Sequence, residues 1–435
     1  MVIENIAHIS NRCYPLRRSV DRRSWLKMYG FLNRVTALGI ATIADAMVCA
    51  KTDSSRLRTL VLLLVILCCA QTGYAQYPPA DFSRNPFLLG VPVDLAVPKP
   101  PVAFQGTDRK FHLVYELHIT NFSKVDLVLR QLDVLDDSSG SALASYSGKE
   151  LRGRLQNLAG RTANQTLSSG TGAVVFIWLD FTDAANTQRL RHRLQLAAPA
   201  FSRFGLQTVE GGSTQVTGEA RVIGPPLRGG EWWAALGPSN HSGHRRTLIA
   251  VDGKARIPER YATDWAKEQN GEILKGDPSK NSSYFGYGAE VLAVADGTVV
   301  SVLDGLPENR PEGQSYPVPM NLKNVGGNNI ILDIGQHQFA FYAHLQPHTI
   351  RVNMGDHVVR GQVLALIGNS GNATGPHLHF QLSDTNSELG TEGLPFMIDS
   401  VELIGNASGE KISLLPRPEV LNRVLPLEDD IVRFP

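Results

Sequence analysis

The chain has few cysteines, and none follows residue 69. All four of them, Cys13, Cys49, Cys68 and Cys69, stand within the first 70 of 435 residues. The last two end an apolar run of about eleven residues, which follows Arg56 and Arg58 and precedes Ala75. A basic start, a short apolar run and a small residue before a cleavage point are typical of a secretory signal. We therefore predict a signal peptide at 47–75 and export of a cysteine-free mature chain to the periplasm or the extracellular space.

The chain also lacks a long apolar run. The run before Ala75 is too short for a bilayer, which requires roughly 20 apolar residues, so no transmembrane segment is expected after signal cleavage. Because Met47 begins an ordinary signal peptide, residues 1–46 are interpreted as a doubtful N-terminal extension, the alternative being a long basic leader. Beyond residue 58 the chain carries 32 basic and 37 acidic side chains, which gives no electrostatic reason to expect nucleic acid as a partner. The sequence gives no indication of the oligomeric state.

Residues 76–225 have the pattern of a β-domain. In 111–119 apolar side chains alternate with polar ones, which predicts a half-buried strand, and a change of phase predicts a bulge near Arg130. The run 173–181 suits a central strand, and 190–196 suits an edge strand or one facing solvent. Short strands between turn-forming clusters predict an immunoglobulin-like β-sandwich. His112, His118 and His192 are expected to be surface histidines, and the Pro- and Gly-rich stretch 224–230 is expected to be a linker.

Residues 231–404 predict a second β-domain with short strands separated by glycine. Asp296-Gly297 predicts the turn of a hairpin over 291–303, and Gly335 predicts the turn between strands 328–334 and 338–344. The stretch 305–327 has no periodicity of its own, as is usual for a functional or disordered loop. Residues 405–435 are expected to form an extended C-terminal tail. Trp232 and Trp233 are expected to pack between domains or to line a groove.

Several enzyme and carrier classes lack their motif in this chain. There is no HExxH, which excludes a thermolysin-type zinc site, and GxSxG fails because residue 372 is asparagine. No lysine lies between Lys323 and Lys411, which argues against a lipoyl or biotinyl carrier domain.

The pair His377 and His379 is the main candidate for a functional site in this sequence. Side chains two residues apart on a strand point to the same face, so both imidazoles can serve one metal, or one can bind it while the other moves a proton. A glycine-rich loop precedes the pair, and His344 ends a strand expected nearby. Asp264 stands in an apolar and aromatic stretch, where a carboxylate is costly to bury unless it is paired or bound to metal.

Several motifs in these segments resemble those of one peptidase family. They are Ala293-x-Ala-Asp-Gly-Thr-Val-Val300, Gly326-Gly-Asn-Asn329, Tyr342-Ala-His-Leu345, Val352-x-x-Gly355-Asp-x-Val-x-x-Gly361-Gln, Gly368-x-Ser-Gly371 and Gly375-Pro-His-Leu-His-Phe380. In this order they resemble the M23 (LytM/lysostaphin-type) zinc endopeptidases over about residues 240–400. The resemblance implies a LytM-type antiparallel β peptidase domain, with Zn²⁺ bound by Asp264 and His379 and with His344 and His377 as the catalytic pair. It implies peptide bonds of peptidoglycan stems or cross-bridges as the substrate.

One position departs from the family's pattern. The first zinc ligand is expected four residues before Asp264, where this chain has Arg260, a side chain that stays protonated and cannot bind zinc. A strand from His244 to Val251, a turn at Asp252-Gly253 and a return strand could bring His244 beside Asp264. His244 is therefore favoured over His241 as the third metal ligand; the alternative is that no replacement exists.

Together these observations predict a mostly β, exported zinc metalloendopeptidase acting on peptidoglycan or another peptide substrate. The alternative is a catalytically degenerate M23-like domain that binds the cell wall or a partner.

Overall fold

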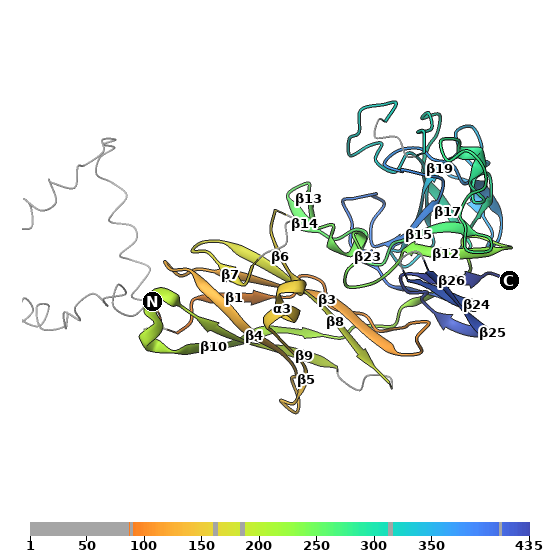
Figure 1. Ribbon diagram of the computed structural model, residues 1–435. Helices are drawn as coiled ribbons and strands as arrows, with labels where there is room; N and C mark the ends of the chain where they lie inside the picture. Colours follow the sequence, from red (N-terminus) through yellow and green to blue (C-terminus); the bar gives the residue numbers. More distant parts are fainter. Residues whose placement is uncertain (1–86, 88–89, 160–163, 183–187, 312–315, 409–410) are drawn as a thin grey trace, which may run out of the picture. The chain divides into compact units, whose positions relative to one another are not determined.

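The computed structural model describes residue 87 and residues 90–159, 164–182, 188–311, 316–408 and 411–435 (Figure 1). All of them lie within the unit Asp81–Pro435. The predictions for residues 1–46 and for the signal peptide at 47–75 fall outside the described residues. The described chain is nearly all β, which confirms the predicted fold class. None of its helices combines the length and the apolar character needed to cross a membrane.

The first two sheets contain five strands each, and side chains from both share one hydrophobic core. One sheet has the order β1 (Val93–Ala96), β3 (Phe111–Asn121), β8 (Gly172–Phe181), β6 (Leu155–Asn157), with β2 (Phe104–Gln105) on β3. The other has the order β10 (Leu206–Gln215), β9 (Arg189–Ala197), β4 (Leu127–Asp136), β5 (Ala142–Ser147), with β7 (Thr166–Leu167) on β4, and the short helix α3 spans Gly148–Arg154. We call these two sheets the sandwich. Their immunoglobulin-like character stays a prediction.

Two predictions about single strands have different outcomes. The register of β4 against β9 shifts between Leu129 and Gln131, so the bulge predicted near Arg130 is confirmed. The prediction that 190–196 forms an edge strand is wrong, because β9 pairs with β10 on one side and β4 on the other. The alternative, a strand facing solvent, fits the arginines of β9, which bind carboxylates of neighbouring segments and stay partly exposed; Arg193 is 38% exposed, and its Nε donates to Glu210 at 2.6 Å.

The histidines predicted at the surface of the sandwich are mostly buried. His112 is 2% exposed, His192 is fully buried and His118 is half-buried, so the prediction is wrong for the first two. On β3 the apolar phase faces the other sheet of the sandwich. The phase that includes His112 and Glu116 is covered as well, because Val114 on that same phase packs into a second hydrophobic core, together with Trp265 and Phe380. A polar phase indicates water only when no further layer covers it.

The C-terminal part is built on a sheet of twelve strands, which we call the large sheet. Its order is β11 (Arg221–Ile223), β24 (Phe396–Ser408), β26 (Asp430–Arg433), β12 (Glu231–Leu236), β15 (Thr263–Glu268), β22 (Leu378–Ser383), β19 (Phe339–Leu345), β18 (Asn328–Asp333), β17 (Gly297–Leu303), β20 (His357–Val358), with β23 (Gly393–Leu394) on β22 and β25 (Lys411–Val424) on β24. Two small sheets join β13 (Ile249–Val251) to β14 (Lys254–Arg256) and β16 (Glu290–Leu292) to β21 (Val363–Leu366). Trp232 is fully buried in the core beneath the large sheet, as a packing residue.

The hairpin over 328–344 is confirmed as β18 and β19, with Gly335 at φ 83°. The hairpin predicted over 291–303 is wrong. Its first half, β16, pairs with β21, and its second half, β17, pairs with β18 and β20. A local Asp-Gly signal indicates a turn, but it does not show which strand each flank will pair with.

The predicted domain limits cross elements of the large sheet. Residues 221–223 pair with β24 as β11, the limit at 404 falls inside β24, and β25 and β26 follow it in the same sheet. Residues 405–435, which were predicted to be an extended tail, therefore contain strands of the large sheet. Two of their side chains, Val432 and Phe434, are buried in its hydrophobic core. The division into a sandwich at 76–225 and a peptidase domain at 231–404 stays a prediction.

Candidate metal centre

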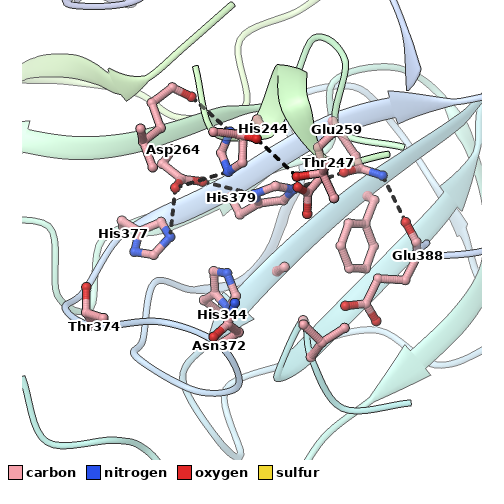
Figure 2. A pocket seen from close by; sticks show the side chains of 17 residues that line it. His244, Thr247, Glu259, Asp264, His344, Asn372, Thr374, His377, His379 and Glu388 are labelled. Atoms are coloured by element: carbon pink, nitrogen blue, oxygen red, sulfur yellow. Dashed lines mark hydrogen bonds and ion pairs between the residues drawn. The ribbon is translucent and has the colours of Figure 1, made fainter. Parts of the chain in front are cut away.

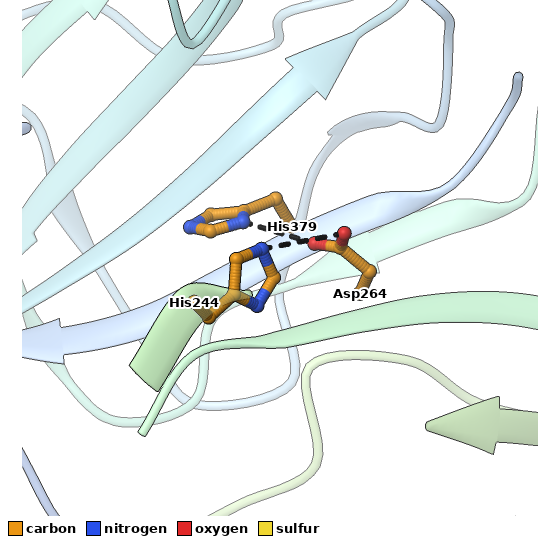
Figure 3. Close-up of side chains that lie close together, drawn as sticks. All are labelled: His244, Asp264 and His379. Atoms are coloured by element: carbon orange, nitrogen blue, oxygen red, sulfur yellow. Dashed lines mark hydrogen bonds and ion pairs between the residues drawn. The ribbon is translucent and has the colours of Figure 1, made fainter. Parts of the chain in front are cut away.

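Three side chains predicted as metal ligands converge on one point. One ligand atom from each of His244, Asp264 and His379 lies within 4.8 Å of the others (Figure 3). Asp264 Oδ1 lies 2.9 Å from Nδ1 of His379, and Asp264 Oδ2 lies 3.4 Å from Nε2 of His244. The two imidazole rings are nearly perpendicular, with centroids 4.9 Å apart. One carboxylate thus lies between two imidazole nitrogens contributed by distant parts of the chain.

The pairing of β15 with β22 explains why Asp264 and His379 meet. The two strands are antiparallel, and Asp264 and His379 are direct Cα partners. Directly opposed residues project on the same face of a sheet, with Cβ atoms roughly 4.5–5.5 Å apart. His377 precedes His379 by two residues and lies on that face as well, with Nε2 3.5 Å from Asp264 Oδ2.

His244 reaches the cluster by a route that differs from the predicted one. It opens a short 3-10 turn, η2 (His244–Arg246), and does not lie on a strand. The turn at Asp252-Gly253 is present, with φ values of 50° and 75°, but it closes the separate β13–β14 hairpin. His241 is exposed and lies outside the cluster, so the structure brings His244 and not His241 to Asp264.

The second nitrogen of each candidate ligand ring is occupied. Nδ1 of His244 donates to the carbonyl of Leu236 at 3.1 Å, which leaves Nε2 directed at Asp264. Nε2 of His379 donates to Oε1 of Gln381 at 3.0 Å, which leaves Nδ1 as the ligand atom. Histidines that bind metal usually donate their other N–H in this way, which fixes the tautomer and the ring orientation.

The electrostatics of the three-residue cluster show how strongly its members interact. Burial disfavours a charged Asp264, but the nearby His377, His244 and His379 outweigh it and hold the pKa of Asp264 well below its usual range. Burial lowers the pKa of His379, but its hydrogen bond to Asp264 prevails and raises that pKa to about 9. An ionised carboxylate thus compensates positive charge on neighbouring imidazoles, as it would compensate a cation bound between them.

His344 and His377 lie beside this cluster (Figure 2). Their ring centroids are 4.8 Å apart, and Nδ1 of each donates to a backbone carbonyl at 2.8 Å, that of Ser370 for His344 and that of Gly375 for His377. In each ring Nε2 is therefore the nitrogen that does not bind a backbone carbonyl. Burial, followed by the charges of His377 and His379, holds the pKa of His344 well below its usual range, so this ring is neutral.

A bulge turns His344 toward the pocket. Ala343 is the Cα partner of His379, so simple alternation would direct His344 to the opposite face with Tyr342. Between its pairs with Asn328 and Ile330, β19 has one more residue than β18, and His344 has φ 63°. Positive φ in a residue other than glycine is uncommon and often marks a functional site.

The cluster opens into a cavity of about 380 Å³. Sequence reasoning missed several of its lining residues: Gln381 and, labelled in Figure 2, Thr247, Glu259, Asn372, Thr374 and Glu388. Gln381 could have been found, since it follows His379 by two residues on the same strand face. Glu259 and Glu388 gave no local signal. Burial raises the pKa of Glu388 to about 7.

Arg260, at the position where the resemblance leads one to expect a ligand, points elsewhere. It is 3% exposed, and its guanidinium binds Glu116, Glu392 and the carbonyl of Gly393. The side-chain partners of Arg260 are thus other residues than His244, Asp264 and His379. The donors in that cluster are two imidazole nitrogens and a carboxylate oxygen, a set that fits Zn²⁺ with a fourth position left for water.

Comparison with known proteins identifies the segment that contains the histidines. Residues 284–390 match the model of peptidase family M23. The chain is 26% identical over 198 residues to the peptidoglycan DD-endopeptidase ShyA of Vibrio cholerae, covering 41% of each, and 34% identical over 79 residues to lysostaphin of Staphylococcus simulans, covering 17% of this chain and 15% of that protein. It thus spans less than half the length of these curated relatives.

Among solved structures, the catalytic domain of lysostaphin from Staphylococcus simulans is 21% identical, with 37% of this chain and 86% of that chain covered at a TM-score of 0.21. The family match includes three of the five predicted site residues and begins after Asp264. Residues 284–390, and with them His344, His377 and His379, are therefore the part of the chain that is similar to peptidase family M23.

Proposed function

We propose that this chain is an exported zinc metalloendopeptidase that hydrolyses peptide bonds of peptidoglycan stem peptides or cross-bridges. The observation that carries the proposal is the convergence of His244, Asp264 and His379 beside His344 and His377 in one cavity. The family match and the peptidoglycan endopeptidase among the relatives support the substrate class.

His244 Nε2, His379 Nδ1 and one oxygen of Asp264 would hold the zinc ion. Three N or O ligands with an open fourth position are typical of catalytic rather than structural zinc. When bound, zinc supplies a Lewis acid that lowers the pKa of a coordinated water toward about 7. Leu236 and Gln381 keep the two rings in the tautomers that this ligation requires.

His377 and His344 would manage the proton and the developing charge. Because Nδ1 of each ring donates to a fixed carbonyl, Nε2 is the atom that accepts a proton from the attacking water and returns it to the leaving amine. Once protonated, the same N–H can donate to the oxyanion that forms on the scissile carbonyl. The low pKa of His344 makes it a neutral acceptor at the outset.

The alternative is a degenerate domain that binds the cell wall without cleaving it. Arg260 favoured that reading in the sequence, because it removes a ligand from its expected place. Two features support the enzyme instead: His244 lies beside Asp264, and the guanidinium of Arg260 is directed to Glu116 and Glu392. A binding module would need neither the ligand cluster nor two histidines with fixed tautomers.

Zinc content and hydrolysis, measured on the same preparations, test the proposal. Wild-type chain should contain about one zinc per molecule and release soluble fragments from purified peptidoglycan. His244→Ala should lose both, whereas His241→Ala, a matched change three residues away at an exposed position, should lose neither. A wild-type chain that binds zinc without releasing fragments would support the binding module. If zinc is absent from wild type, or if His241→Ala and not His244→Ala removes it, the proposed site is wrong.

A further inference from the structure

A buried carboxylate of the sandwich lies between two arginines that flank the metal-site residues. Glu116 on β3 is 2% exposed, Arg245 is fully buried and Arg260 is 3% exposed. Arg260 donates to Glu116 through Nε at 3.0 Å and Nη2 at 2.8 Å, and Arg245 Nη1 donates to Glu116 Oε1. Burial disfavours the charge on Glu116, but both guanidinium groups outweigh it and lower its pKa to about 2, so the carboxylate is ionised.

The two arginines stand next to the candidate ligands in the sequence. Arg245 directly follows His244 within η2, and Arg260 precedes Asp264 by four residues. Arg245 is fixed further by Nη2, which donates to the carbonyl of Tyr115 at 2.9 Å on the same sandwich strand. A displacement of either guanidinium would therefore move the backbone that presents a ligand.

The segment that carries His244 has little regular structure of its own. Between β12 and β15 it contains only η2 and the short β13–β14 hairpin. Several of its contacts are to the sandwich: Gln156 Nε2 donates to the carbonyl of Arg246 at 3.0 Å, and the guanidinium of Arg246 lies 4.2 Å from the ring centroid of Phe176. Asn240 also donates to the carbonyl of Phe176 at 3.2 Å. The sandwich therefore helps to determine where this segment lies.

We propose that Glu116 is a positioning residue of the metal site. Through Arg245 it holds His244 in place, and through Arg260 it fixes the backbone that leads to Asp264. The sandwich is then an integral part of the metal centre and not a separable module. This inference rests on the proposed zinc site, and it explains how His244, the third ligand, is held there. Arg260 stands where the family resemblance leads one to expect a ligand. Its ion pair with Glu116 is one of the contacts that let His244 serve as the ligand instead.

The charged network makes the link specific. A buried ion is tolerated only when paired and hydrogen-bonded, so Glu116, Arg245 and Arg260 each require the others in this arrangement. Residues that orient metal ligands from behind typically change metal affinity by roughly 10- to 100-fold when they are replaced. The effect of Glu116 should therefore be visible in metal binding before any effect on catalysis is considered.

The test is metal affinity of the full chain in which Glu116→Gln removes the charge and keeps the shape. Zinc affinity is measured by competition with a chelating dye, and Co²⁺ substitution reports the ligand set through its visible absorption. We expect zinc to bind about 10- to 100-fold more weakly, with weaker cobalt absorption and an unchanged far-ultraviolet circular dichroism spectrum. The matched control is Glu419→Gln, which removes the exposed pair between Arg109 and β25 and should leave zinc affinity unchanged.

A second variant tests the same idea without leaving a buried charge unpaired. Gln156→Leu removes the donor to the Arg246 carbonyl and should weaken zinc binding by several-fold. If Glu116→Gln fails to fold, this variant decides: wild-type affinity would overturn the inference, and reduced affinity would support it. If wild type binds zinc and both folded variants bind it equally well, only the inference fails. If wild type binds no zinc, the proposed function fails and the inference with it.

Discussion

Asp264 and His379 are Cα partners across β15 and β22, with Oδ1 of the carboxylate 2.9 Å from Nδ1 of the imidazole. The distance follows from the strand register and not from a flexible loop. A slip of one residue in either strand would send one side chain to the opposite face of the sheet and separate the pair. Two of the three candidate ligands are therefore preorganised by backbone pairing, whereas His244 depends on the turn that presents it.

The amide of Gln381 should tune zinc affinity. Its Oε1 accepts the Nε2–H of His379 at 3.0 Å, while its Nε2 donates to Ser383 and to the carbonyl of Glu388. Gln381→Leu removes the acceptor and releases the tautomer of His379, so we expect roughly 10- to 100-fold weaker zinc binding in dye competition. His357→Ala, at an exposed position outside this network, is the control. Equal affinity of Gln381→Leu and wild type would contradict this role.

His344 and His377 should be needed for hydrolysis and not for the metal. Neither belongs to the ligand cluster, so His344→Ala and His377→Ala should keep close to one zinc per chain. Loss of a general base or an oxyanion donor typically lowers the rate by about 10²- to 10⁴-fold. The rate of fragment release from peptidoglycan, with zinc content measured in parallel, checks this. His357→Ala, at an exposed position, serves as the control. Zinc-free variants, or variants with wild-type rates, would show that the division of roles is wrong.

Local sequence pattern was enough to predict several features of the fold and of the candidate site. Alternation predicted β3, the spacing of His377 and His379 predicted a shared face, and Asp252-Gly253 predicted a turn. Each depends on residues close in the sequence, where backbone geometry has few options. The resemblance to the M23 family supplied the roles of Asp264 and His344, which the residues themselves had only made candidates.

The features that sequence analysis did not predict depend on contacts between segments that are distant in the sequence. Glu116 resembled a solvated strand residue, because nothing near it indicates that Arg245 and Arg260, more than a hundred residues later, cover that face. The bulge that turns His344 into the pocket arises from the register of β18 against β19. In the same way, β16 was matched with its neighbour in sequence although β21 is its partner. Pairing over long separations is set by the packing of the whole sheet.

Zinc binding should release a proton from His379. In the metal-free chain the pKa of His379 is raised to about 9, yet ligation requires Nδ1 without a proton. Below pH 9 zinc must displace that proton, so the apparent affinity should rise by about tenfold per pH unit from 7 to 9 and then level off. Calorimetry at pH 7.5 in buffers of different ionisation enthalpy should give about one proton released. An affinity that does not change between pH 7 and 9 would contradict ligation by His379.

The raised pKa of His379 also sets the sign of a stability effect in the metal-free chain. A folded-state pKa of about 9 against roughly 6.5 when unfolded means that the charged pair with Asp264 stabilises the chain fully below pH 6.5. That contribution is lost as the pH rises through 9. Bound zinc should remove this dependence, because the ligated ring carries no exchangeable proton on Nδ1. Denaturant midpoints with and without chelator, compared at pH 6 and 9, check the sign.

His192 should make the sandwich sensitive to acid. Burial lowers its pKa to about 4; its Nδ1–H donates to the carbonyl of Gly212 at 3.0 Å, and its Nε2 accepts from the hydroxyl of Tyr115 at 2.9 Å. The unfolded chain, with a histidine pKa near 6.5, binds the proton first as the pH falls, so stability should decline between pH 6.5 and 4 by up to about 3 kcal/mol. Denaturant unfolding of wild type and His192→Leu across this range measures it. The variant should be less stable at pH 7, since Tyr115 loses its acceptor. Its stability should, however, fall less steeply as the pH is lowered. His337→Ala, at an exposed position, is the control and should follow wild type. Identical slopes for wild type and His192→Leu would mean that another group is responsible for the sensitivity to acid.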